Sequence, residues 1–100
     1  MMRLFWTPEA VQDRDDIYDY IEADNPSAAL SLDELFSDKA KYLIDHPGLG
    51  RQSRVPETRE LVMPRNYILV YDVVGDSVRV LRVIHAALQW PPVATKESRG

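Results

Sequence analysis

Tyr67-Ile68-Leu69-Val70-Tyr71-Asp72-Val73-Val74 is the stretch of the chain that decides the fold. Six of its eight residues are β-branched or aromatic, which are the side chains that extended strands favour. Successive side chains of a strand point to opposite faces, so both faces of this strand are apolar. Such a strand is typical of the centre of a sheet, with a partner strand on each side.

Two further extended runs flank the central one. Residues 78–84 follow it across Gly75-Asp76, a two-residue hairpin turn, and residues 59–63 precede it across Pro64-Arg65-Asn66, a three-residue turn. Short turns join antiparallel strands, so the sequence predicts an antiparallel meander. On the last strand, alternation divides the side chains between two faces: Val78, Val80, Arg82 and Ile84 on one, and Arg79, Leu81, Val83 and His85 on the other.

The front half of the chain predicts a short strand followed by two helices. Leu4-Phe5-Trp6 is an apolar run that stops at Thr7-Pro8, an N-cap followed by a first helical residue. This helix should end near Asp24, because Asn25-Pro26 repeats the same start signal. The second helix should close at His46-Pro47-Gly48. A turn this short forces the two helices to be antiparallel, each with one apolar stripe that the sheet must cover.

The fold class predicted from these elements is α+β, in the order β-α-α-β-β-β. An antiparallel twisted sheet carries the N-terminal helical hairpin on one face, and residues 48–56 form an irregular connection. About a hundred residues suffice for a single core, so we expect one domain over residues 1–92 and a disordered tail over 93–100.

Composition excludes several classes of protein. The chain has no cysteine, which rules out a disulfide scaffold, thiolate catalysis and the usual zinc knuckles. No apolar run approaches the ~20 residues of a membrane span, and Thr7-Pro8 interrupts the start before a signal sequence develops, so we expect a cytoplasmic protein. His46 and His85 lie in different elements, and no glycine-rich loop opens a helix after a strand. We therefore expect no metal and no cofactor.

Charge is distributed unevenly along the chain. Residues 1–50 hold 11 acids and 4 bases, whereas residues 51–100 hold 5 acids and 8 bases. Seven of those eight bases are arginine, which favours bidentate recognition of phosphate or carboxylate. The arginines either serve internal pairs with the acidic half or form a local cationic patch on an acidic protein.

The candidate site follows from the placement of these arginines on the predicted sheet and its loops. Six guanidiniums could ring the open face or the edge of the sheet, those of Arg51, Arg54, Arg59, Arg65, Arg79 and Arg82. The alternative is internal pairing, of Arg59 with an acid such as Glu57 and of Arg82 with Asp72.

Two further residues near the end of the chain each have two interpretations. His85, at the end of the last strand, is either structural or a general acid or base. Trp90 either caps the core or anchors a partner.

Short motifs run through the whole chain in a fixed order: Trp6-Thr7-Pro8-Glu9-Ala10, Asp16-Ile17, Tyr20-Ile21, Asn25-Pro26-Ser27-Ala28-Ala29, Pro47-Gly48-Leu49-Gly50-Arg51, Thr58-Arg59-Glu60-Leu61-Val62, Tyr67-Ile68-Leu69-Val70-Tyr71 and Arg82-Val83-Ile84-His85-Ala86-Ala87-Leu88-Gln89-Trp90-Pro91. By their order and spacing, the chain resembles the RelE/ParE superfamily of toxins from type II toxin–antitoxin systems. The fold that the resemblance implies is the one predicted above.

Within the superfamily, the Thr-Arg-Glu-Leu strand and the His-Ala-x-x-x-Trp-Pro ending look like the ParE branch. Members of that branch inhibit DNA gyrase and stall it with cleaved DNA, and they are regarded as inhibitors rather than enzymes. The resemblance thus implies a growth-inhibiting toxin with a role in plasmid stabilisation and no catalytic residues. Its implied target-binding residues are Arg51, Arg59, Arg65, Arg82, His85 and Trp90.

The alternative is a RelE-like endoribonuclease that cuts mRNA on the ribosome without a metal. It would use Arg59 and Arg82 as phosphate clamps, His85 as acid or base, and Glu57 or Glu60 as the opposite partner. Two departures weaken it. The lysine-rich loop typical of RelE is missing, and the His-Tyr ending of one nuclease branch is replaced by His85-Ala86.

The family also implies a cognate antitoxin protein, encoded next door, that neutralises the toxin. Such a partner would dock as a helix in a groove or as a strand on a sheet edge, and the toxin would contact DNA only through the antitoxin complex. We expect no membrane among its partners. A third hypothesis is a small RNA-binding module in which Tyr67 and Tyr71 stack on bases.

Overall fold

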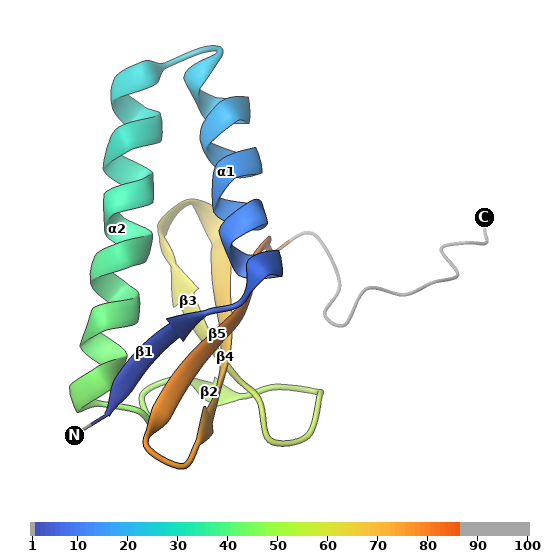
Figure 1. The fold of residues 1–100 in the computed structure, drawn as a ribbon. Coiled ribbons are helices and arrows are strands. Elements are labelled where there is room, and N and C mark those ends of the chain that lie inside the picture. The colour runs from blue at the N-terminus through green and yellow to red at the C-terminus, as the bar shows by residue number, and fades with distance from the viewer. Residues whose placement is uncertain (1, 87–100) are drawn as a thin grey trace.

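Five strands form one mixed sheet, and two antiparallel helices cover one of its faces (Figure 1). The computed structural model describes residues 2–86, so Trp90 and the predicted tail over 93–100 lie outside the described residues. The elements in chain order are β1 (Arg3–Trp6), α1 (Pro8–Glu22), α2 (Pro26–Asp45), β2 (Arg51–Gln52), β3 (Arg59–Met63), the 3-10 turn η1 (Pro64–Asn66), β4 (Tyr67–Val74) and β5 (Ser77–His85).

The sheet has the strand order β1-β5-β4-β3-β2, which places the predicted central strand, β4, in the middle. The two turns of the meander are also confirmed. Val74 pairs with Ser77 across Gly75-Asp76, and Met63 pairs with Tyr67 across the three residues of η1. Gly75 has a φ of 58°, a left-handed conformation that glycine adopts without a steric penalty.

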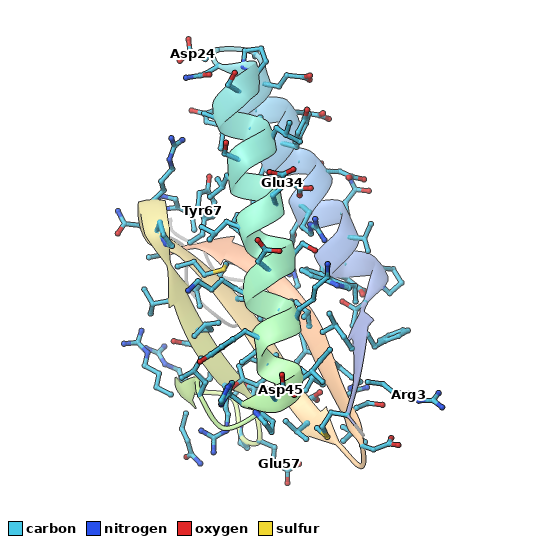
Figure 2. The ribbon with its side chains drawn as sticks, turned by 90° about the vertical axis from the view of Figure 1, so that its left-hand side faces the viewer. Arg3, Asp24, Glu34, Asp45, Glu57 and Tyr67 are labelled. Atoms are coloured by element: carbon cyan, nitrogen blue, oxygen red, sulfur yellow. The ribbon has the colours of Figure 1, made fainter. Side chains whose placement is uncertain are left out.

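Both predicted helix starts are present. The Thr7 side chain accepts a hydrogen bond from Ala10 N at 3.1 Å, and the Asn25 side chain accepts one from Ala28 N at 3.1 Å. A proline follows each cap at the start of its helix. These caps replace backbone partners that the first turn of a helix lacks. Asp24 lies at the free end of the hairpin, well beyond Tyr67 at the end of the sheet (Figure 2).

The core lies between the helical hairpin and the sheet. The α2 residues that point into it recur at intervals of three or four, as one face of a helix requires: Ala29, Leu32, Phe36, Ala40 and Leu43. They meet fully buried side chains of β4 and β5, including Leu69, Tyr71, Val78 and Val80. A smaller cluster on the other face of the sheet contains Ile68, Val70 and Ile84.

The sheet differs from the prediction in being mixed rather than antiparallel throughout. β1 runs parallel to β5, with Arg3 opposite Ser77 and Trp6 opposite Val80. The physical reason is the path of the chain. The helical hairpin returns the chain to the end of the sheet where β1 began, and β3 leaves that end in the same direction as β1. β4 reverses the direction and β5 reverses it again, so β5 runs parallel to β1. A second difference is β2, a two-residue strand inside the connection that was predicted to be irregular.

The predicted alternation along the last strand is wrong beyond Val80. Val70 pairs with Arg82 while Tyr71 pairs with Val80, so Leu81 is the extra residue of a β-bulge. The bulge inverts the later side chains. Val83 therefore joins Val80 in the core beneath the helices, and Ile84 packs in the cluster on the opposite face.

Candidate functional site

Arg59 does not pair with Glu57, which corrects the first of the two alternative ion pairs. Its Nη1 donates to Gly50 O at 2.7 Å and to Gly48 O at 3.4 Å. Tyr71, on β4, binds the same loop. Its hydroxyl accepts from Gly50 N at 2.8 Å and donates to Pro47 O at 2.8 Å. The connection between α2 and β2 is thus tied to β3 and β4 by two side chains.

Arg82 pairs with Asp13 rather than with Asp72, which corrects the second. Arg82 Nε donates to Asp13 Oδ2 at 2.7 Å and Arg82 Nη2 donates to Asp13 Oδ1 at 2.9 Å. Asp13 Oδ2 also accepts from Val83 N at 2.9 Å, on the edge of β5 that β1 leaves open beyond Trp6. Hydrogen bonding to Asp13 raises the pKa of Arg82, so this guanidinium stays charged.

Two more arginines form pairs on the sheet face opposite the helices. Arg79 makes two hydrogen bonds to Asp72, at 2.8 and 2.6 Å, and these raise the pKa of Arg79. Arg51 lies 3.3 Å from Glu60, whose other oxygen accepts from Ser53 Oγ at 3.1 Å. The Arg51 side chain is 65% exposed, so this second pair is weak and open to competition.

Arg54 and Arg65 are exposed and form no ion pair within residues 2–86. Arg65 has a φ of 63°, a left-handed conformation that costs a residue with a side chain about 1 kcal/mol. Glu57, at the tip of the β2–β3 loop, has a φ of 66°. Asn66, next to Arg65, has a φ of 65°, and glycine would adopt the conformation of all three residues without strain.

The uneven charge of the two halves is thus neutralised only in part. Of the four arginine–carboxylate salt bridges between described residues, only Arg82–Asp13 joins the acidic half to the basic half. The exposed guanidiniums of Arg51, Arg54 and Arg65 form no ion pair with the acidic helices.

The arginines are spread along the sheet. Arg51, Arg54 and Arg59 lie at the β2 edge and its loops, and Arg65 lies at the other end of the sheet, near His85. Arg82 lies between them, opposite Val70, which is opposite Glu60, so β4 separates it from β3. The length of β3, about 13 Å from Arg59 to Met63, separates Arg59 from the turn η1 that carries Arg65. The backbone bond from Ala86 N to Asn66 O joins the end of β5 to the turn that carries Arg65.

His85 packs edge to face against Tyr67, with ring centroids 5.1 Å apart. Both rings line a groove of about 230 Å³ between α1 and the end of β5, together with Ile17, Tyr20 and Ile84. Asp13 and Arg82 form part of its wall. The groove is mostly apolar, with charged groups along one side.

Within residues 2–86, the nuclease candidates Glu57, Glu60 and His85 are not brought together. Glu60 lies opposite Val70, and Val70 lies opposite Arg82, so one strand separates Glu60 from Arg82 and β5. His85 is three residues further along β5, about 10 Å across the sheet from β3 and about 10 Å further along it. Glu57 is on the exposed loop beyond the opposite end of β3. Within residues 2–86, no three His, Asp or Glu side chains are grouped to hold a metal ion.

Tyr67 and Tyr71 do not form a base-stacking platform. Tyr71 is fully buried with its hydroxyl hydrogen bonded, and Tyr67 packs against Phe36 with ring centroids 5.5 Å apart. The hypothesis of an RNA-binding module that stacks bases on these tyrosines therefore loses its stacking residues.

Sequence reasoning missed the importance of Asp13. A signal was present, because Asp13 lies three residues after Ala10 and four before Ile17, on the face of α1 that packs inward. A carboxylate within an apolar stripe needs a partner. The partner is Arg82, from the other end of the chain.

The hairpin of helices on one face of a five-stranded mixed sheet, with the arginines on its strands and loops, defines a class: the chain is a toxin of the RelE/ParE superfamily. Residues 4–90 match the family model described as the ParE toxin of the type II toxin–antitoxin system parDE. The chain belongs to this ParE toxin family. Membership implies an antitoxin partner.

Individual relatives agree with this assignment. The putative toxin Y4kP of Sinorhizobium fredii is 39% identical over 92 residues, covering 91% of this chain and 95% of the relative. Toxin RelE2 of Caulobacter vibrioides is 33% identical over 87 residues, covering 87% of this chain and 98% of the relative.

Solved structures give the same fold. A chain of the chromosomal ParDE toxin–antitoxin system from P. aeruginosa superposes with a TM-score of 0.77 at 32% identity, covering 85% of this chain and 96% of that one. The conserved hypothetical protein HP0894 from Helicobacter pylori shares the fold at 18% identity, with a TM-score of 0.53 and coverage of 83% and 92%. No helix among residues 2–86 has the length and apolar character needed to span a membrane.

Proposed function

We propose that this toxin inhibits DNA gyrase, and so blocks replication and growth until its cognate antitoxin binds it. The observation that carries the proposal is the match of residues 4–90 to the ParE family model. The likeness to a chain of a chromosomal ParDE system, at 32% identity, supports it. The proposal includes action in the cytoplasm, without a metal or cofactor, and contact with DNA only as the antitoxin complex.

The geometry supports inhibition by binding rather than by catalysis. Arg82 is paired with Asp13, one nitrogen of Arg59 serves backbone carbonyls, and His85 is about 10 Å or more from Glu60 in both sheet directions. Acid–base cleavage of RNA needs a proton donor, a proton acceptor and free cations within reach of one phosphate.

The contact surface that we propose has two parts. Arg51 presents an exposed guanidinium at the β2 edge, and Arg65 presents another at the tip of η1, where its left-handed backbone is strained. Arg82 and His85 flank the groove near the second part. Trp90 stays a predicted contact. Binding through exposed guanidiniums is weakened by salt, because ions screen charges beyond about 8 Å at physiological ionic strength.

The alternative, RelE-like cleavage of mRNA on the ribosome, has one observation in its favour, the 33% identity to the relative named Toxin RelE2. The chain keeps Arg59, Arg82 and His85, the residues that such chemistry would use. It requires that the Asp13–Arg82 pair opens, so that the Arg82 guanidinium can meet a phosphate.

Two cell-free assays with purified toxin separate these functions: supercoiling by gyrase, and cleavage of mRNA on translating ribosomes. Each is run with the wild type, Arg82→Ala and His85→Ala. We expect loss of supercoiling with intact mRNA. Codon-positioned mRNA cuts that disappear in His85→Ala, with normal supercoiling, would replace the proposal by the alternative.

A further inference from the structure

The loop that joins α2 to β2 is held against the sheet by two side chains from different strands. Tyr71, on β4, is fully buried, and its hydroxyl both accepts from Gly50 N and donates to Pro47 O, each at 2.8 Å. Arg59, on β3, donates to Gly50 O at 2.7 Å. Both hydrogen-bonding groups of the Gly50 backbone are therefore used by side chains of the sheet.

The loop passes so close to the sheet that only glycine fits. A Cβ atom at Gly50 would lie 2.8 Å from Glu60 O and 2.8 Å from the Tyr71 ring. At Gly48, two residues earlier, a Cβ atom would meet nothing within 4 Å. The close approach therefore lies at the residue immediately before Arg51.

β2 depends on this attachment. It consists of two residues, with only Arg51 opposite Glu60 and Gln52 opposite Arg59. A pairing this short contributes little by itself, so its place on the edge of the sheet has to come from its neighbours. The Gly50 attachment is adjacent in sequence to Arg51, whose exposed side chain forms only the weak pair with Glu60.

We propose that Arg59 and Tyr71 form a lock on Gly50 that positions Arg51 for contact with the target, and that Arg59 is a positioning residue rather than a contact residue. The inference rests on the proposed function for its target, but the lock itself does not depend on which target is bound. It assigns different roles to two arginines that the sequence alone treats alike. Arg51 touches the partner, and Arg59 acts through the Gly50 carbonyl.

A double-mutant cycle tests the proposal, with half-maximal inhibition of gyrase supercoiling as the readout. We expect Arg59→Gln, Tyr71→Phe and Arg51→Gln each to weaken inhibition about tenfold, as loss of one charge-assisted contact does. Because Arg59 acts through Arg51, adding Arg59→Gln to Arg51→Gln should cause no further loss. If Arg59 touches the target itself, the losses multiply to about a hundredfold and the proposal fails.

Two controls separate positioning from a general loss of structure. Arg65→Gln removes an exposed arginine in the other part of the proposed contact surface that makes no bond to the lock, so its effect should multiply with that of Arg59→Gln. Arg59→Lys keeps a donor for Gly50 O and should inhibit gyrase better than Arg59→Gln does. If Arg59→Gln loses inhibition only because it is unfolded, Arg59→Lys should show no such recovery. Full inhibition by Arg59→Gln or by Tyr71→Phe would also overturn the proposal.

Failure of the proposed function is distinguishable from failure of the lock. If wild-type toxin leaves gyrase unaffected, the gyrase assignment is wrong, and the same cycle is then run on growth arrest by the expressed toxin, whatever its target. The lock is also read directly by amide exchange. Gly50 N should exchange faster in Tyr71→Phe than in the wild type, and unchanged exchange would contradict the lock.

Discussion

Asp13 on α1 and Arg82 on β5, 69 residues apart in sequence, form a two-point ion pair at 2.7 and 2.9 Å. The same carboxylate accepts from Val83 N, and Thr7 at the start of α1 donates to Leu81 O. Side chains at the start of α1 therefore bond the free backbone groups of β5 beyond the end of β1. An open strand edge is a site of unwanted pairing, so this attachment both closes the fold and protects the edge.

Asp13→Ala should lower the free energy of unfolding by about 2 kcal/mol, because it removes three hydrogen bonds and leaves a half-buried guanidinium without its partner. For a chain of this size the melting temperature should fall by about 10 °C. Asp15→Ala is the matched control. Its carboxylate is exposed on the same helix, and we expect a change within about 0.5 kcal/mol. Equal destabilisation by the two substitutions would show that the pair contributes nothing specific.

Arg82 should contribute the same stability from pH 7 to pH 10. Its pKa is raised in the folded state by Asp13, so its contribution is fully present below the pKa of arginine in the unfolded chain and is lost only above that value. The difference in unfolding free energy between the wild type and Arg82→Ala, measured by chemical denaturation, should stay constant over this range. A difference that shrinks before pH 10 would contradict the prediction.

Gly50→Ala and Gly48→Ala should behave differently although they are two residues apart. The added methyl group at Gly50 collides with Glu60 O and with the Tyr71 ring, whereas the one at Gly48 meets open space. We expect Gly50→Ala to destabilise the protein by about 1–3 kcal/mol and Gly48→Ala to have little effect. Thermal unfolding of both variants decides the matter. Similar melting temperatures would mean that the loop does not approach the sheet as described.

Arg65→Gly should separate stability from activity. Glycine adopts the φ of 63° without strain, so the variant should be as stable as the wild type or more stable, by up to about 1 kcal/mol. Loss of the exposed guanidinium should at the same time weaken growth inhibition. The test compares melting temperature with the toxin level needed for growth arrest. A variant that keeps full toxicity would remove Arg65 from the contact surface.

Local signals were sufficient for most of the fold. Thr7-Pro8 and Asn25-Pro26 predicted both helix starts, and Gly75-Asp76 predicted a hairpin turn, because each depends on a few adjacent residues. The parallel pairing of β1 with β5 depends on how distant segments meet, and no local pattern encodes it. The bulge at Leu81 was missed although the sequence carried a sign of it, because strict alternation would place Arg82 on the same face as the buried Val78 and Val80.

The candidate site was less predictable than the fold. Residue type showed that arginine dominates the back half, but the partner of each arginine depends on tertiary contacts. Asp72 was the expected partner of Arg82 and instead holds Arg79, directly opposite it on the neighbouring strand. Arg59 was expected to pair with an acid such as Glu57 or to clamp a phosphate; the Glu57 pair is absent, and one nitrogen of Arg59 donates to the carbonyls of Gly48 and Gly50.

The most direct test of the gyrase assignment is the cleavage state of plasmid DNA after incubation with gyrase and the purified toxin. A toxin that stalls gyrase on cleaved DNA should convert supercoiled plasmid to linear DNA, released after detergent and protease treatment, in proportion to the toxin added. Arg51→Gln should reduce the linear product. If no linear DNA accumulates at any toxin concentration that arrests growth, gyrase is not the target.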